Sequence, residues 1–154
     1  MTAVSDGDSM AGTSESRGLL LYWMMAAVSL VGLGDSIYLT VQHLSGETLR
    51  CTLISGCSEV LGSSYAVIAG VPLAVIGAAA YFTVFSLAIL AAFGYRLAGT
   101  LLIALVGGMF VMTLWLTFLQ AFVIHHFCQF CLLSALTTLI LTGLVIAQRR
   151  RAAS

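Results

Sequence analysis

Four long apolar stretches take up most of the chain and limit what it can fold into. They run from about Leu19 to Val41, Val71 to Phe93, Leu97 to Ile124 and Cys128 to Ala147. A helix of about 20 apolar residues crosses a hydrocarbon core of about 30 Å, so each stretch is long enough to span a membrane. Of the 154 residues, 60% are hydrophobic and 8% are charged, which is too apolar for a soluble domain of this size. The sequence therefore predicts an all-α, integral membrane bundle of four transmembrane helices in a lipid bilayer.

The segments outside these stretches divide the chain further. Residues 1–18 are small, polar and acidic, so we expect a disordered cytoplasmic tail. They lack the basic start of a signal peptide, and the first span is therefore expected to be retained. The membrane domain is predicted to cover residues 19–148, and residues 149–154 to form a basic cytoplasmic tail.

The arginines indicate how the bundle is oriented, because short positively charged loops stay in the cytoplasm. Five of the six lie on one predicted side, and Arg50 alone lies on the other; the five are Arg17, Arg96, Arg149, Arg150 and Arg151. We expect a multi-pass protein of the inner (plasma) membrane with both termini cytoplasmic, and with the 43–69 loop and the 125–127 turn outside. The chain has no lysine and a formal net charge of zero, so no nucleic acid is expected as a partner.

Cys128 and Cys131 form a CxxC pair at the start of the fourth predicted span. This spacing lets two sulfurs meet across one helical turn and cycle between dithiol and disulfide. The helix N-terminus favours a thiolate there, because its N–H groups and dipole stabilise negative charge. Zinc binding with His125 and His126 is an alternative, but adjacent histidines cannot easily face one ion, and we predict no metal site.

Cys51 and Cys57 form a second pair in the predicted outer loop. Five residues separate them, and Gly56 allows a tight bend, so a disulfide between them is sterically plausible. The pair is either a static staple or one stage of a relay, and we favour the relay. The loop pair would then meet a soluble thiol protein, while Cys128 and Cys131 lie at the edge of the hydrocarbon, where quinones dissolve.

Several motifs, taken in this order along residues 30–135, resemble the vitamin K epoxide reductase (VKOR) family in its bacterial, single-domain form. They are Gly34-Asp-Ser-Ile-Tyr38-Leu39, the Cys51 to Cys57 loop with Ser58-Glu-Val-Leu-Gly-Ser63-Ser64, then Gly70-Val-Pro72-Leu-Ala-Val-Ile-Gly77, and the CxxC. The resemblance implies a four-helix bundle closed around a quinone, which is ubiquinone, menaquinone or a vitamin K-like molecule. It also implies a short periplasmic helix near Ser58–Tyr65.

The resemblance also implies a path for electrons. Cys51 would exchange with a separate periplasmic thioredoxin-fold (DsbA-like) protein, and Cys57 would then attack a disulfide at Cys128. Cys131 would deliver the electrons to the quinone, and Ser63 matches a family serine near the quinone. The expected function is that of a quinone-dependent thiol-disulfide oxidoreductase that supports disulfide bond formation.

Two positions depart from the vertebrate members of the family. Where those enzymes have an asparagine in the second span and a tyrosine one turn after the CxxC, this chain has Leu73 and Ala135. The polar contacts to vitamin K are therefore missing, and quinone reduction is a better prediction than epoxide reduction. Vitamin K reductase activity and a non-catalytic, disulfide-stapled scaffold remain the alternatives.

A few residues of the spans are further candidates for the site. Asp35 is the acidic residue deep in a span, so it should face the bundle interior, either in a quinone site or proton relay or in a structural hydrogen bond. Phe127 and Phe130 flank the CxxC and are expected to contact the quinone. Trp23, Trp115 and Phe122 are expected to face lipid or to pack. Close helix packing is predicted at the glycines of the spans, which are Gly32, Gly34, Gly77, Gly107, Gly108 and Gly143.

Overall fold

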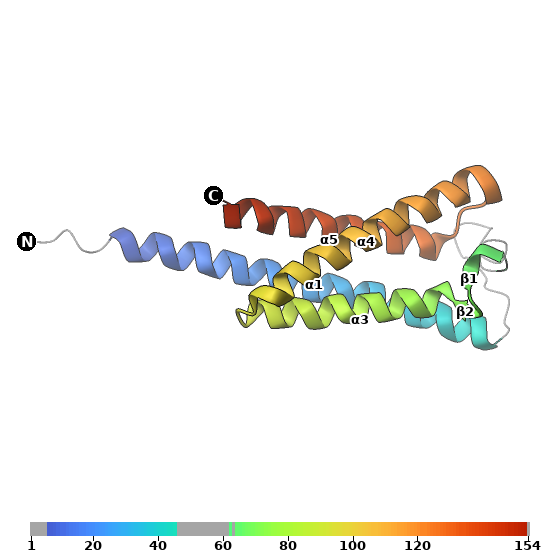
Figure 1. Ribbon diagram of the computed structural model, residues 1–154, viewed down its shortest axis with the longest axis horizontal. Coiled ribbons are helices and arrows are strands. Elements are labelled where there is room, and N and C mark those ends of the chain that lie inside the picture. Colours follow the sequence, from blue (N-terminus) through green and yellow to red (C-terminus); the bar gives the residue numbers. More distant parts are fainter. Residues whose placement is uncertain (1–5, 46–61, 63, 154) are drawn as a thin grey trace, which may run out of the picture.

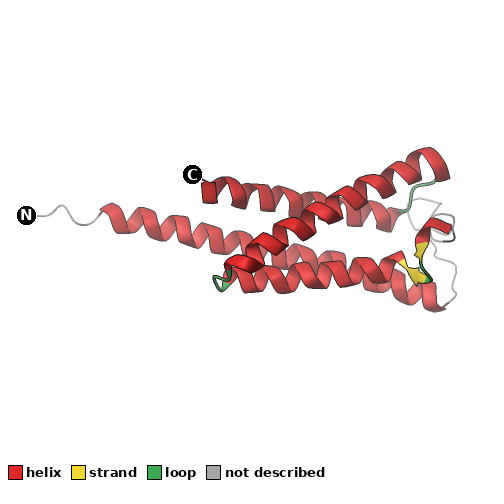
Figure 2. Ribbon diagram, in the orientation of Figure 1, coloured by secondary structure: helices red, strands yellow, loops and turns green. Residues whose placement is uncertain are grey.

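Helices make up most of the described chain (red in Figure 2), and four of them are long. The computed structural model describes residues 6–45, 62 and 64–153. Its long helices are α1 (Asp6–Ser45), α3 (Leu73–Ala92), α4 (Arg96–Leu119) and α5 (Gln129–Ala153). Each contains a stretch long and apolar enough to cross a membrane. The predicted all-α, four-transmembrane-helix bundle is thus confirmed.

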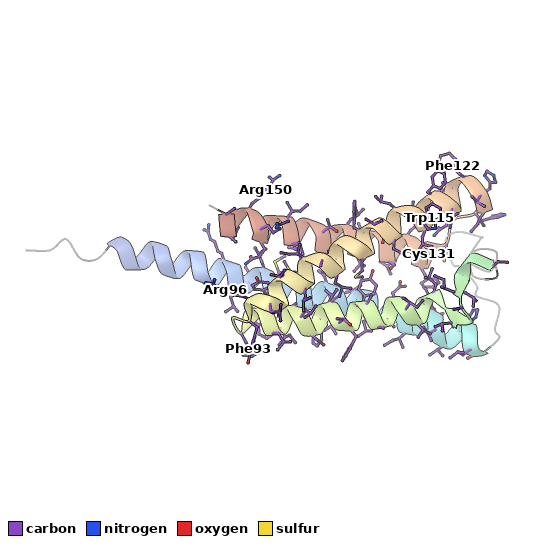
Figure 3. All side chains as sticks on the ribbon, viewed as in Figure 1. Phe93, Arg96, Trp115, Phe122, Cys131 and Arg150 are labelled. Carbon is purple, nitrogen blue, oxygen red and sulfur yellow. The ribbon has the colours of Figure 1, made fainter. Side chains whose placement is uncertain are left out.

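The helices form a ring in which each one packs against two others. α1 contacts α3 and α5, and α4 contacts the same two helices from the other side. Figure 1 shows the C-terminus and the turn between α3 and α4 at one end of the bundle, and the connection between α4 and α5 at the other. Arg96 and Arg150 lie at the first end, whereas Cys131 lies near the second (Figure 3). The arginines and the CxxC pair are therefore separated along the bundle, as predicted.

Both terminal helices are longer than predicted. α1 begins at Asp6, so the prediction of a disordered tail is wrong for residues 6–18. α5 continues to Ala153, so residues 149–153 of the predicted basic tail are a continuation of the helix. Once a membrane segment has formed the costly first turn, each added residue gains a hydrogen bond, and the helix grows into polar sequence. Composition alone did not show this.

A small β-hairpin precedes α3. Its strands are β1 (Val67–Ile68) and β2 (Val71–Pro72), which pair antiparallel. The turn residues Ala69 and Gly70 have φ angles of 52° and 84°, the left-handed conformation of a two-residue type I′ turn. The predicted second span therefore starts two residues late, at Leu73, after the hairpin has ended. Of the predicted short helix at Ser58–Tyr65, residues 58–61 and 63 lie outside the described residues, and a 3₁₀ turn, η1, covers Ser64–Ala66.

The apolar core occupies the half of the bundle nearest the arginines. It is formed by the N-terminal halves of the α1 span and α4 together with the C-terminal halves of α3 and α5. Its buried members are Leu21, Met25, Ala26, Tyr81, Val84, Ala88, Leu102, Val106, Leu141 and Val145. Tyr81, only 1% exposed, is the member nearest the CxxC end of α3. The chain is therefore well packed on one side of Tyr81.

The glycines of the spans differ in how close they lie to neighbouring helices. A Cβ at Gly32 would overlap the Tyr81 ring, and a Cβ at Gly77 would lie 3.2 Å from Ser36 Oγ. These two glycines allow α1 and α3 to approach closely, as predicted. The same prediction is wrong for the other four, because a Cβ there would meet nothing within 4 Å; they are Gly34, Gly107, Gly108 and Gly143.

We predict that Gly32→Ala destabilises the bundle. The added methyl group must push the Tyr81 ring or separate α1 from α3, and overpacking of this kind costs about 1–3 kcal/mol. Thermal unfolding of the purified protein in detergent measures the effect. Gly34→Ala, on the same helix with open space around it, is the matched control and should unfold at the wild-type temperature. Equal stability of the two variants would contradict the packing described here.

Candidate active site

A distorted end of α4 places the CxxC pair. α4 continues into one π-helical turn, η2 (Gln120–Ile124), and the next residue, His125, is left-handed with φ 56°. A π-helical turn often marks a functional site, and a left-handed histidine is an uncommon, strained conformation. Together they reverse the chain within residues 125–128, and Cys128, which is 0% exposed, lies directly before α5.

The two sulfurs of the pair interact with each other. Cys128 and Cys131 are both free thiols, and their side chains are hydrogen-bonded. Cys128 lies outside the membrane-spanning helices, and its pKa is lowered to about 7 mainly by that side-chain hydrogen bond. Burial of the thiol raises this pKa, whereas hydrogen bonds from the backbone N–H groups of Cys131 and Phe130 lower it further. A thiol with this pKa is about half ionised to the nucleophilic thiolate at neutral pH.

Gln120 holds the pair from α4, and the sequence analysis did not identify it. Its side chain is 5% exposed, and its Oε1 accepts a hydrogen bond of 3.3 Å from the Cys128 N–H. Its side chain also hydrogen-bonds with Cys131. One amide thus contacts both cysteines and fixes the loop to the end of α4. The signal in the sequence was a glutamine in an apolar span, eight residues before the CxxC.

A cavity of about 380 Å³ lies between the helices on the CxxC side of Tyr81. All four long helices and the hairpin line it, and Cys131 is in its wall. Most of the lining is apolar; these residues include Leu39, Ile68, Leu73, Ala74, Ile76, Met109, Met112, Leu116, Leu119, Ile124 and Ala135. Ligand pockets measure roughly 300–1,000 Å³ and are mainly apolar with a few polar groups. A quinone ring, flat and apolar with two carbonyl oxygens, fits that description.

Tyr81 closes the inner end of this cavity. Its hydroxyl lies 2.8 Å from Ser134 Oγ and 3.1 Å from Thr138 Oγ1, and it donates to the Ser134 carbonyl oxygen at 3.0 Å in an alternative arrangement. The ring therefore ties α3 to α5 at the level where the packed core ends. A buried hydroxyl with several partners also keeps its polar atom satisfied within an apolar bundle.

Asp35 is a buried polar residue of the cavity with one unpartnered oxygen. The residue is 8% exposed, lines the cavity, and its Oδ2 has no hydrogen bond. Cys131 lines the same cavity. Buried polar atoms are nearly always hydrogen-bonded, so an orphaned carboxyl oxygen in a cavity indicates a missing partner. The structure thus places Asp35 inside the bundle, as expected, in the wall of the cavity that Cys131 also lines.

The other predicted quinone contacts lie elsewhere. Phe127 is 43% exposed, and Phe130 packs its ring against Tyr38 with centroids 5.3 Å apart; neither lines the cavity. Their contact with a quinone stays a prediction. Trp23, Trp115 and Phe122 are exposed, with the last two in a row of aromatic rings along the outside of α4, as expected for residues facing lipid. Cys51, Cys57 and Ser63 lie outside the described residues.

The zinc alternative finds no support in the described part of the chain. Within residues 6–45 and 64–153, no three His, Cys, Asp or Glu side chains come together in a way that could hold a metal ion. His125 and His126 are both exposed, whereas Cys128 is buried.

The fold and the site define a class: a four-helix membrane protein with a thiol pair at the wall of an internal apolar cavity. Residues 23–146 match the model of the Vitamin K epoxide reductase family, which covers most of the chain. The chain therefore belongs to the Vitamin K epoxide reductase family and is a multi-pass membrane oxidoreductase. No curated protein matches the chain.

We predict that Cys131→Ala raises the pKa of Cys128 towards the ordinary value of about 8.5. The substitution removes the side-chain hydrogen bond that lowers this pKa most, while burial of Cys128 remains. The ultraviolet absorbance of the thiolate, followed against pH, measures the shift when Cys51 and Cys57 are both alanine. Leu133→Ala, an exposed change on the same helix, should leave the first ionisation near pH 7. A Cys128 titration unaffected by Cys131→Ala would contradict the assignment.

Proposed function

We propose that the protein is a quinone-dependent thiol-disulfide oxidoreductase that re-oxidises a secreted thioredoxin-fold partner and so supports disulfide bond formation. The observation that carries the proposal is the position of Cys131 in the wall of an apolar cavity inside the bundle. A dithiol at that place can pass electrons to a lipid-soluble acceptor without leaving the protein. Membership of an oxidoreductase family supports the same conclusion.

The proposed path uses both cysteine pairs. Cys51 exchanges with the partner's disulfide-forming thiols, and Cys57 then attacks the disulfide between Cys128 and Cys131, which leaves the inner pair reduced. Each transfer is the attack of a thiolate on a disulfide sulfur, so it depends on a thiol that ionises near neutral pH. When Cys57 attacks the Cys128 sulfur, Cys131 leaves as the thiol, and Cys51 then attacks Cys57 and releases Cys128. The lowered pKa of Cys128 makes it a good leaving thiolate in that second exchange.

The acceptor is proposed to bind in the cavity. When bound, a quinone accepts two electrons and two protons and leaves as a quinol. The apolar side chains of α3 and α4 would hold its ring, Gln120 and Asp35 offer polar atoms for its oxygens, and Cys131 faces it. Ser63, Phe127 and Phe130 would complete the site from the loop and the rim. Ubiquinone, menaquinone and vitamin K-like quinones all share the ring chemistry that this site requires.

Reduction of vitamin K epoxide is a weaker alternative. Leu73 and Ala135, which replace the asparagine and tyrosine of the vertebrate enzymes, both line the cavity. The departures noted in the sequence therefore fall on the wall of the proposed binding site, where they remove two polar contacts.

Placement in the inner membrane with both termini in the cytoplasm follows from the arginines. The end that carries Arg96 and Arg149–Arg151 would face the cytoplasm, and the CxxC end would face outward. Thiol and disulfide exchange proceeds in such an oxidising space. An impermeant maleimide applied to intact cells should therefore reach the loop cysteines Cys51 and Cys57.

We predict that the purified protein, mixed anaerobically with ubiquinone or a menaquinone analogue and a reduced thioredoxin-fold protein, forms quinol. Quinol formation is followed by its ultraviolet absorbance. Cys128→Ala and Cys131→Ala should each abolish it, because either change removes the dithiol. Leu136→Ala, an exposed position on α5, is the matched control and should keep the wild-type rate. Quinol formation by either cysteine variant at the wild-type rate would rule out this function.

A further inference from the structure

We infer that Asp35 transfers protons between the thiol pair and the bound quinone. The inference rests on the proposed function. It assigns to Asp35 the proton transfer that accompanies electron transfer from the thiols to the quinone. It starts from an unusual placement: Asp35 is the acidic residue in the four apolar spans, and it is almost fully buried. Carboxyl groups inside a membrane segment are expensive and generally functional.

The surroundings of Asp35 give no structural reason for a buried carboxyl group at this position. A carboxyl group kept for stability is normally paired with a cation or has all its oxygens hydrogen-bonded. Among the described residues that line the cavity there is no arginine or histidine, and Oδ2 has no partner. The oxygen is therefore available to a molecule in the cavity.

Few groups in the lining of the same cavity have exchangeable protons, and this limits which of them can exchange a proton with Asp35. Beside Asp35 they are the Cys131 thiol, the Tyr81 phenol and the hydroxyls of serine and threonine side chains. Tyr81 is held by Ser134 and Thr138, and its hydroxyl lies at the inner end of the cavity. Cys131 is the one that must lose a proton in the reaction, and it lines the same cavity as Asp35.

The chemistry balances with Asp35 unchanged at the end. Cys128 and Cys131 each lose an S–H bond and form the S–S bond, and the electron pair passes to the quinone, whose two oxygens each gain a proton. Asp35 gives its carboxyl proton to the nearer quinone oxygen and takes the proton of Cys131. The proton of Cys128 is released to water, and water supplies the second proton of the quinol.

The kinetic test compares Asp35→Asn, which keeps size and polarity but not the acid, with wild type in single turnover. The pre-reduced protein is mixed with ubiquinone, and quinol is measured. We expect Asp35→Asn to slow quinol formation about 100-fold or more, the usual contribution of a positioned acid or base, and to lose the solvent deuterium isotope effect. Asp35→Glu should recover a large part of the rate. Ser29→Ala, a buried polar change on the same helix away from the cavity, is the matched control and should react as wild type.

Two further measurements separate this role from a structural one. Equilibrium binding of ubiquinone to Asp35→Asn should be within a few-fold of wild type. Infrared spectra of the reduced, quinone-free protein should contain a protonated-carboxyl band that Asp35→Asn removes and Cys131→Ala shifts. An unchanged single-turnover rate in Asp35→Asn, or a carboxyl band indifferent to Cys131→Ala, would overturn the inference. If wild type itself forms no quinol, the proposed function fails; if Asp35→Asn forms it as fast as wild type, only the role of Asp35 fails.

Discussion

The hydrogen bonds of the Tyr81 hydroxyl lie at the boundary between a packed half and a hollow half of the bundle, and the rest of the structure depends on this boundary. On one side, small and branched apolar residues of all four helices pack closely, with Gly32 leaving room for the Tyr81 ring. On the other side, the same helices enclose a cavity of about 380 Å³. The hydrogen bonds from Tyr81 to Ser134 and Thr138 join α3 to α5 at this boundary. A rigid, packed half therefore supports a hollow half that can admit a ligand.

The membrane explains why the site is built on helix ends. Lipid offers no hydrogen bonds, so the backbone inside it must be helical, and irregular backbone is tolerated only where protein covers it. The π-helical turn, the left-handed His125 and the β-hairpin all lie at one end of the bundle, where α4 and α1 stop (Figure 1). This end also carries the thiols. Strained backbone and the thiol pair thus gather at the end of the bundle, at the boundary between apolar and polar surroundings.

The fold was largely predictable, and the candidate site only partly. For most ends of the spans, the length of the apolar stretch predicted the position to within a few residues. This works because the thickness of the bilayer sets the length of a spanning helix. The helical start of α1 at Asp6 was missed, since a membrane helix can extend into polar sequence without a compositional signal. Cys128, Cys131 and Asp35 were identifiable from residue type and position. Gln120 was not, because nothing in the sequence shows that the end of α4 bends back over the start of α5.

By itself, the sequence determined that the chain spans a membrane four times, that five of its six arginines lie at the end opposite to the CxxC, and which family motifs it carries. These properties depend on hydropathy, charge and spacing, which are local. The tertiary structure decided which glycines allow close packing, that Leu73 and Ala135 face one cavity, and that the unpartnered oxygen of Asp35 lies in that cavity beside Cys131. These facts depend on how each helix is rotated about its axis, and in lipid that rotation is set by contacts between helices.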